Sequence, residues 1–404
     1  MSGLGGSTNQ ESSRKAGRST GGAGAVRGPV RVGFVPLIDA APLVAALELG
    51  FFADEGLAVS LERQIGWANV RDKLAYGHLD ASHALLGMPL ASALAAGAPG
   101  AAEWQGEPIV GVMSLSCGGN AITLSKRLIE QGANSAATLA RFVQAPHRGA
   151  EGPVVLGHVF GCSMHHYLLR EWLEGAGINP DLDVKLCVIP PPQMVGHLAG
   201  GSLDGFCVGE PWNTLAQREG AGVVVAPTAD ILPGHPEKVL AVTRRWAADN
   251  RQLLPAMIRA VLRACRWCSE PANVGALAEM LAMPRYVGVP ADVVRECLTV
   301  DRTFGVGPRF AWMRPADWAM RSFAPAATFP SRTHVGWLLE QMIRWGHVAP
   351  DVDVAEVADR CTDSAAYREA ADALRLTCPE TEYPPMALRN GQTYVVREAV
   401  GDRR

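Results

Sequence analysis

The sequence predicts an α/β protein made of two similar lobes with a ligand cleft between them. A short motif occurs twice, as LAYGHLD at 74–80 and as LAGGSLD at 198–204, and an apolar run and a Gly-x-Pro follow each copy. The order strand, helix, strand, helix, strand also surrounds both copies. This order is typical of α/β lobes with parallel sheets.

The elements of the two copies correspond one to one. Apolar runs indicate the strands, and apolar residues recurring at three and four positions indicate the helices. The first copy consists of VRVGFV, PLVAALELGFF, LAVSLERQI, a short helix and ALLGMP at 84–89. The second consists of PVVLGHVF, HHYLLREWLEGAG, DVKLCVIP, a short helix and CVGEP at 207–211. Matched order over both segments favours an internal duplication.

Two further runs predict how the chain passes between the lobes. PIVGVMSLSCGGNAITLS at 108–125 has the pattern of a crossing strand with a flexible point at its paired glycines, and KVLAVTRRW at 238–246 that of the return. NRQLLPAMIRAVLRACRWCSE and THVGWLLEQMIRWGHV have helical periodicity. The predicted organisation is a disordered arm at 1–29, lobe I at 30–120 plus 241–350, lobe II at 121–240, and a C-terminal helical extension and tail at 351–404.

Composition excludes several classes of function. The chain has 404 residues, 48% hydrophobic and 19% charged, which is ordinary for a globular protein. A net charge of -3 gives no general basic field, so no direct nucleic-acid binding is expected. No apolar run reaches the roughly 18 residues that span a bilayer, so no membrane insertion is expected.

The N-terminal segment and the cysteines indicate a cytoplasmic location. The first 30 residues are rich in Gly and Ser, and no apolar core of the kind found in a secretory signal follows their basic residues. The 9 cysteines are an odd number without the short spacings of a disulfide framework. Both observations are expected of a chain that stays in the cytoplasm.

In the stretch FCVGEPWN, residues 206–213, an apolar run typical of a buried strand is followed directly by a glycine, a charged residue and a proline. In open α/β sheets the ligand binds at the carboxyl ends of the strands, beside helix N-termini that favour anions. The stretch therefore predicts a ligand loop in which Gly209 allows close backbone approach. A plain strand-ending turn is the alternative, but it does not explain why Gly-x-Pro recurs at Gly87 and Pro89.

Familiar catalytic motifs are missing from the sequence. It contains no GxxxxGK[ST] phosphate loop, HExxH helix or GxSxG elbow. Cys265 and Cys268 form a lone CxxC in a strongly helical segment, which favours buried helix cysteines over a redox or metal pair. A zinc site and a helix start with two histidines are the two interpretations of His158, Cys162, His165 and His166, and the second is favoured.

Three residues have patterns suited to an anion site. His165 stands in the first turn of a helix that faces the predicted cleft, where a side-chain donor would reinforce anion binding. Lys238 directly precedes an apolar run near the return crossing, where its charge would complement an anion; a solvated lysine is the alternative. Trp67 opens the helix after the first lobe's second strand, and its indole N–H is a donor only; a core tryptophan is the alternative.

These stretches resemble the nitrate and bicarbonate solute-binding proteins of ABC transporters and their cytoplasmic relatives, the NasS-type nitrate and nitrite sensors. The resemblance covers about residues 30–350 and implies the two-lobed periplasmic-binding-protein type II fold. The matching stretches are VRVGFVPLIDAAPLVAALELGFFADEGL, GWANVRDKL, VIPPPQMV, LDGFCVGEPWN and HPEK.

The resemblance also implies a ligand set of a tryptophan, an amide, a histidine, a backbone glycine and a lysine. By local motif these correspond to Trp67, Asn120, His165, Gly209 and Lys238, with His166 as second choice for the histidine. Asn120 departs from the family, which often has glutamine there. Lys238 favours a monoanion such as nitrate, because the bicarbonate binders differ at that lysine and can recruit calcium.

The expected function is a cytoplasmic nitrate or nitrite sensor that controls a NasT-type RNA-binding ANTAR antiterminator and regulates nitrate assimilation. The alternative is the solute-binding component of a nitrate or bicarbonate ABC transporter. Thiamine-pyrimidine synthases share this clamp fold, but their cysteine-rich CCCFC-like motif is absent, so no enzyme activity is expected. No cofactor, no metal and no catalytic residues are expected either.

Overall fold

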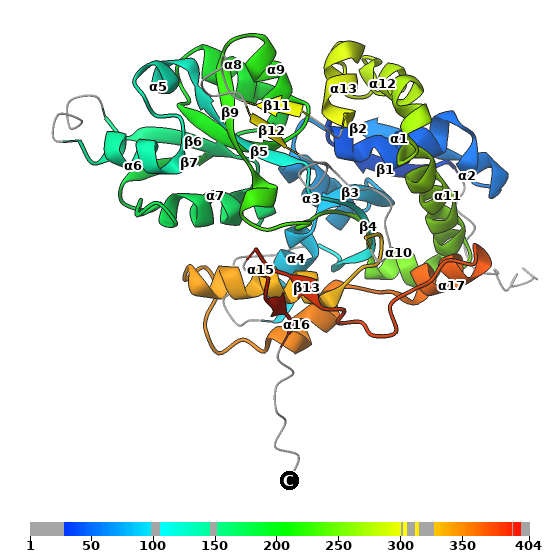
Figure 1. Ribbon diagram of the computed structural model, residues 1–404. Helices are drawn as coiled ribbons and strands as arrows, with labels where there is room; N and C mark the ends of the chain where they lie inside the picture. Colours follow the sequence, from blue (N-terminus) through cyan, green and yellow to red (C-terminus); the bar gives the residue numbers. More distant parts are fainter. Residues whose placement is uncertain are drawn as a thin grey trace, which may run out of the picture.

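A computed structural model describes residues 28–97, 106–145, 152–299, 302–304, 312–314, 327–389 and 391–396. It contains two α/β lobes side by side, with C-terminal helices beneath both in the view of Figure 1. The fold class predicted from the repeat is therefore confirmed. The predicted disordered arm at 1–29 lies almost entirely outside the described residues.

Each lobe is built on a five-stranded sheet, and the two sheets have the same design. In lobe I the order is β2 (Val59–Arg63), β1 (Val30–Phe34), β3 (Ala81–Leu85), β10 (Pro236–Thr243) and β4 (Ile109–Cys117). In lobe II the order is β7 (Val184–Val188), β6 (Val154–His158), β8 (Gly205–Gly209), β5 (Asn120–Ser125) and β9 (Gly222–Pro227). The central strands β3 and β8 are buried along their whole length, as strands covered on both faces are.

The prediction of parallel sheets is wrong in part, because both sheets are mixed. The first three strands of each order pair in parallel, whereas β10 and β5 run antiparallel to both of their neighbours. The cause is that β5 enters lobe II from the crossing and β10 enters lobe I on the return, so each lies in its sheet without a helical crossover that would make it parallel.

The repeated motif has the same structural role in both lobes. The last residue of LAYGHLD, Asp80, accepts a hydrogen bond from the backbone N–H of Arg31 at 2.8 Å and donates its own N–H to the Arg31 carbonyl at 2.9 Å. The last residue of LAGGSLD, Asp204, forms the same two bonds with Val155, at 2.9 and 2.8 Å. Each aspartate thereby joins the entry of its lobe's third strand to the first strand.

The outgoing crossing runs straight from β4 into β5. Gly118 and Gly119 separate these strands, with φ angles of 70° and 84°. Glycine adopts this left-handed region without the steric cost that a Cβ imposes, which explains the glycine pair at this point.

Helices cover the sheets and complete the hydrophobic cores. Lobe I carries α1 (Ala41–Glu48), α2 (Phe51–Asp54), α3 (Trp67–Ala75), α4 (Gly87–Gly97), α10 (Arg244–Asp249), α11 (Leu253–Cys268), α12 (Val274–Ala282) and α13 (Ala291–Leu298). Lobe II carries α5 (Lys126–Glu130), α6 (Ala136–Val143), α7 (Met164–Glu174), α8 (Met194–Ala199) and α9 (Trp212–Arg218). One core cluster extends through both lobes, so the lobes are packed against each other.

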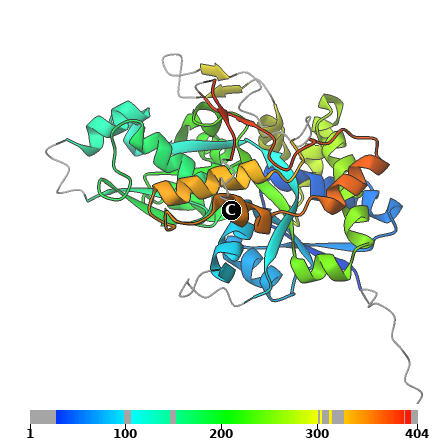
Figure 2. The same ribbon diagram turned by 90° about the horizontal axis from the view of Figure 1, so that it is seen from below.

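The C-terminal part lies against both lobes. It contains α15 (Arg332–Arg344), α16 (Val354–Cys361) and α17 (Ala365–Ala373), and the short strands β13 (Met386–Ala387) and β14 (Thr393–Tyr394). Helix α15 contacts α4 of lobe I and α7 of lobe II, and Figure 2 shows it lying along the underside of the molecule. Arg344 at its end forms ion pairs with Glu171 and Glu174 of α7. Strands β13 and β14 pair as a two-stranded sheet. A separate two-stranded sheet pairs β11 (Arg302–Phe304) with β12 (Trp312–Arg314).

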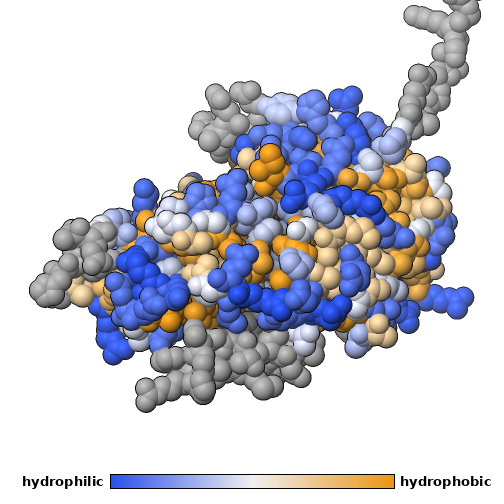
Figure 3. Space-filling view, turned by 90° about the horizontal axis from the view of Figure 1, so that it is seen from above, coloured by the Kyte–Doolittle hydropathy of each residue, from blue (hydrophilic) through white to orange (hydrophobic). Residues whose placement is uncertain are grey.

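Figure 3 shows one face of the molecule, on which hydrophilic and hydrophobic residues are interspersed. Among the described residues, no helix has the length and apolar character needed to cross a membrane.

Candidate functional site

The GEPW loop joins the two lobes. It follows β8 of lobe II, and its Glu210 carbonyl accepts a hydrogen bond from the backbone N–H of Ile38 in lobe I at 2.9 Å. The indole of Trp212 donates to the carbonyl of Pro36 at 3.2 Å. The loop therefore lies at the carboxyl end of its strand and against the opposite lobe, where the sequence predicts a ligand loop.

A second contact shows how closely the lobes approach. A Cβ at Gly87, the first residue of α4, would lie 1.8 Å from the carbonyl oxygen of Cys162 in lobe II. Only glycine permits this approach. The repeated Gly-x-Pro thus serves lobe contact in both copies, through Gly87 in lobe I and through the GEPW loop in lobe II.

The five predicted ligand residues lie within one group of buried side chains, which we call the buried polar cluster. They come from both lobes: α3, β5, α7, β8 and β10 each supply one. The structure adds three residues that the sequence prediction did not include, Asp39, His83 and Glu237. The complete cluster is Asp39, Trp67, His83, Asn120, His165, Gly209, Glu237 and Lys238.

Trp67 brings an indole donor into the cluster from lobe I. It begins α3 directly after Gly66, and its side chain is 2% exposed. Its ring lies 5.4 Å from the ring of His83, and the ammonium of Lys238 lies 5.4 Å from its ring centroid. Within the part of the chain that the structure describes, the Nε1–H has no hydrogen-bond partner. A buried donor without a partner is costly, which favours a ligand-binding role over plain core packing.

Asn120 and Gly209 face each other across the lobe II sheet. They form a register pair of the antiparallel strands β5 and β8. A Cβ at Gly209 would lie 3.2 Å from Oδ1 of Asn120 and 3.8 Å from Oδ2 of Asp39. The side-chain amide nitrogen Nδ2 of Asn120 is buried, and no described residue accepts a hydrogen bond from it.

Lys238 is fully buried between two carboxylates. Its Nζ lies 2.8 Å from Oδ2 of Asp39 and donates to Oε2 of Glu237. Burial alone would lower the pKa of Lys238, but the charges of both carboxylates outweigh this effect and raise it. Burial likewise would raise the pKa of Asp39, but Lys238 and His83 hold it well below its usual range. The solvated lysine considered from the sequence is therefore excluded.

His165 lies in the cluster as a neutral imidazole. It is 0% exposed, and Nδ1 lies 3.7 Å from Oε1 of Glu237, beyond hydrogen-bond distance. Burial, and then the charge of Lys238, lower its pKa well below the usual value. No described residue forms a hydrogen bond with either ring nitrogen. Both nitrogens are thus available to a ligand.

His166, the second choice for the histidine, lies outside the cluster. Its Nδ1 lies 3.1 Å from Nε2 of His158, and Arg170 donates to its Nε2 at 3.0 Å. Burial, with smaller contributions from His158 and Arg170, lowers its pKa to about 2. Consecutive residues on a helix point about 100° apart, so α7 presents His165 and His166 to different surroundings.

A β-bulge explains why Glu237 was missed. Successive side chains of a regular strand point to opposite faces, so alternation places Glu237 away from Lys238. The pairing of β10 with β4 shifts register on both sides of Lys238, and bulges of this kind re-aim side chains. Glu237 thereby joins Lys238 in the cluster. The adjacency of the two charges in HPEK is the signal that the sequence offered.

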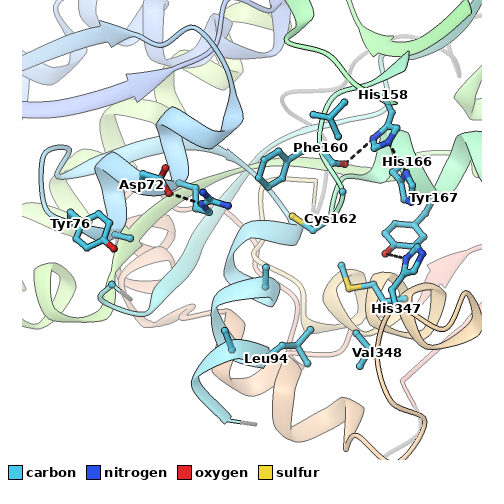
Figure 4. A pocket seen from close by; sticks show the side chains of 18 residues that line it. Asp72, Tyr76, Leu94, His158, Phe160, Cys162, His166, Tyr167, His347 and Val348 are labelled. Carbon is cyan, nitrogen blue, oxygen red and sulfur yellow. Dashed lines mark hydrogen bonds and ion pairs between the residues drawn. The ribbon is translucent and has the colours of Figure 1, made fainter. Parts of the chain in front are cut away.

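A large cavity lies on the other side of α7. Its volume is about 1120 Å³, and its wall comes from α3, α4, the loop after β6, α7 and the end of α15. In Figure 4, His158, His166 and Tyr167 lie on one side, with the Tyr167 hydroxyl bonded to Nδ1 of His347 at 2.8 Å. None of the five predicted ligand residues lines this cavity. It is much larger than a small inorganic anion requires.

The zinc interpretation finds no geometric support. The described residues contain no group of three or more His, Cys, Asp or Glu side chains placed to hold a metal ion. His165 points away from its proposed co-ligands, into the buried polar cluster. Cys265 and Cys268 lie on α11, and burial raises the pKa of both thiols, which disfavours the reactive thiolate form.

Comparison with known proteins identifies the family. Residues 24–282 match the NMT1-like family. The chain is also 33% identical to the nitrate/nitrite binding protein NrtA of Synechococcus elongatus, over 89% of this chain and 81% of that protein. The chain belongs to the NMT1-like family. Its architecture is similar to the crystal structure of the periplasmic nitrate-binding protein NrtA from Synechocystis PCC 6803, with a TM-score of 0.82, 26% identity, and coverage of 91% of this chain and 95% of that one.

Other relatives that match the chain are longer proteins. The bicarbonate transport ATP-binding protein CmpC of Synechocystis is 37% identical over 90% of this chain, and the chain spans 53% of its length. The chain spans about half the length of the first such relatives. The alkanesulfonate-binding protein SsuA from Xanthomonas axonopodis, at 15% identity and a TM-score of 0.58, shares the fold alone.

Proposed function

We propose that the protein is a receptor for nitrate or nitrite and that the anion binds at the buried polar cluster. The observation that carries the proposal is the set of buried, unpartnered donors that converge there from both lobes. Within the described chain, Nε1 of Trp67, Nδ2 of Asn120 and the ring nitrogens of His165 have no hydrogen-bond partner. Gly209 adds close backbone approach, and Lys238 adds the positive charge.

An anion between the lobes accounts for all five predicted residues at once. Nitrate is planar, carries one negative charge and accepts hydrogen bonds only, so it complements donors arranged around it. Because the donors come from opposite lobes, the bound anion adds contacts that exist only while the lobes are together. It therefore favours the closed arrangement. The likeness to NrtA in sequence and architecture supports this ligand class.

The expected affinity is limited by the small size of the ligand. Nitrate has four heavy atoms, and a ceiling near 1.5 kcal/mol per atom gives about 6 kcal/mol, which corresponds to a dissociation constant of tens of micromolar. Tighter binding requires charge-assisted hydrogen bonds, each contributing about 1.5–3 kcal/mol. Lys238 supplies the charge.

Isothermal titration calorimetry with nitrate, nitrite, bicarbonate and sulfate tests the proposal. We expect saturable binding of nitrate or nitrite, and weakening by at least about tenfold in a Lys238→Ala variant. A His166→Gln variant is the matched control, since His166 lies on the same helix but outside the cluster, and we expect it to retain the affinity. The proposal fails if neither anion binds to the purified chain.

The relatives bear on the role that anion binding serves. The names of CmpC and of the nitrate import ATP-binding protein NrtC specify transport, which supports the alternative prediction from the sequence, the solute-binding component of an ABC transporter, over the sensor. The cytoplasmic location and the NasT-type ANTAR antiterminator partner stay predictions. Mixing the chain with such an antiterminator, with and without nitrate, tests them by size-exclusion chromatography; a complex that nitrate dissociates would support the sensor, and the absence of any complex would oppose it.

A further inference from the structure

Leaving its histidines aside, the charges of the buried polar cluster do not balance. Lys238 brings one ammonium, whereas Asp39 and Glu237 bring two carboxylates, both in contact with that ammonium. His83, 2.8 Å from Asp39, adds a positive charge only when protonated. The two carboxylates are 6% and 1% exposed at the residue level, so water screens them little. An added anion would place three negative groups around one positive group. Isolated buried charges are costly enough that such sites usually change protonation instead.

A neutral His165 cannot donate hydrogen bonds to both the anion and Glu237. A neutral imidazole donates from one nitrogen only. If one nitrogen donates to the anion, the other presents a lone pair, and Nδ1 lies 3.7 Å from the unpartnered Oε1 of Glu237. A lone pair and a carboxylate oxygen repel each other. One added proton between them converts this repulsion into a hydrogen bond.

We infer that the site takes up one proton together with its anion, and that the proton is held between His165 and Glu237. The inference rests on the proposed function, since it concerns the same anion site. The proton comes from the solvent and no other bond changes. The imidazole then donates from both nitrogens, to the anion and to the carboxylate. The net charge of the cluster is the same before and after binding.

Other titratable groups face this pair from the surrounding elements. His83 lies 2.8 Å from Asp39 and is thereby directed to a different carboxylate. His235 bonds to the hydroxyl of Thr228 at 2.8 Å, and burial lowers its pKa to about 4. Burial lowers the pKa of His158 to about 4 as well. Burial also keeps the Cys207 thiol protonated by raising its pKa. The His165–Glu237 pair is therefore the favoured acceptor.

The sign of the pH dependence follows from linkage. The pKa of His165 lies well below its usual value without the anion, chiefly through burial, so this imidazole carries no extra proton near neutral pH. A bound anion stabilises the protonated form and raises that pKa. Binding is therefore strongest at low pH. It weakens by about tenfold per pH unit between the pKa of the free form and the higher pKa of the anion-bound form, and it levels off above the latter.

The experiment is nitrate calorimetry on the full chain in paired buffers of different ionisation enthalpy, between pH 6.5 and 8.5. The difference in apparent enthalpy between buffers gives the number of protons taken up. We expect a value near one over part of this range and a dissociation constant that rises with pH. A value near zero throughout, with a constant affinity, would overturn the inference, and so would uptake of a metal cation in place of the proton.

A Glu237→Gln variant locates the proton. Its amide can donate to Nδ1 of His165 and still accept from Lys238, so no added proton is needed. We expect no proton uptake, an affinity that changes less than about twofold over the same pH range, and tighter binding than the native chain at pH 8.5. The matched control is Glu174→Gln on the outer side of α7, where proton uptake should persist. Unchanged uptake in Glu237→Gln would contradict the assignment.

The same titrations separate the two proposals. Absence of nitrate and nitrite binding at every pH contradicts the proposed function. Binding without proton uptake contradicts only the inference drawn here. If the Glu237→Gln chain fails to fold, proton counting on the native chain still decides whether a proton is taken up.

Discussion

Replacement of Lys238 by methionine tests the electrostatics of the site most severely. Methionine keeps the unbranched shape of the side chain but removes the ammonium that contacts Asp39 and Glu237. Both carboxylates then remain buried without a cation. Breaking a buried ion pair by removing one partner costs about 3–5 kcal/mol, because it leaves an uncompensated charge. We expect a loss of that size in the free energy of unfolding.

The assay is urea denaturation of single and combined variants. In an Asp39→Asn, Glu237→Gln background the carboxylate charges are gone, so Lys238→Met should cost far less there than in the native chain. The native-background variant should also regain stability as the pH falls, because its folded form binds a proton that neutralises an unpaired carboxylate. A loss below about 1 kcal/mol, or the same loss in both backgrounds, would refute the charge network.

Three further predictions concern the donors, the backbone approach and the buried histidines. Trp67→Phe should weaken nitrate binding by about 10- to 100-fold by removing one hydrogen bond to the anion, whereas Trp345→Phe, outside the cluster, should not; equal effects in calorimetry would contradict this. Gly209→Ala should fold but bind nitrate at least about tenfold more weakly, because its methyl lies 3.2 Å from Oδ1 of Asn120, and Gly196→Ala, with open space around it, is the control. The urea concentration at the unfolding midpoint should decrease as the pH is lowered from about 6.5 towards 4. Burial lowers the pKa of His334 to about 4, so in this range the unfolded chain takes up protons that the folded chain excludes. Each such histidine lowers the free energy of unfolding by about 1.4 kcal/mol per pH unit, and a constant midpoint would oppose this.

The repeat in the sequence predicted the fold because the repeated motif makes the same hydrogen bonds in both lobes. Asp80 and Asp204 form equivalent hydrogen bonds in the two lobes, so both copies of the motif keep the aspartate. The direction of β5 and β10 was not predicted correctly, since strand polarity depends on where the chain crosses between lobes. No local pattern of residues encodes that choice.

The candidate site was predicted in part. Trp67, His165, Gly209 and Lys238 stand near element boundaries or crossings, where sequence patterns alone draw attention to them, whereas Asn120 was named only through the family resemblance. The structure brings all five together. Asp39, His83 and Glu237 were missed. His83 lies inside a buried strand and looks like a core residue, and Glu237 reaches the cluster only through the bulge in β10. Long-range packing, rather than spacing, determines these positions.

The central claim is that a small inorganic anion binds at the buried polar cluster between the lobes. A crystal structure of the chain grown with nitrate tests this most directly. We predict planar density of the anion within hydrogen-bond distance of Nε1 of Trp67, Nδ2 of Asn120 and Nζ of Lys238. Nitrate density confined to the large cavity beside His166, or absent from the cluster at saturating nitrate, would contradict the claim.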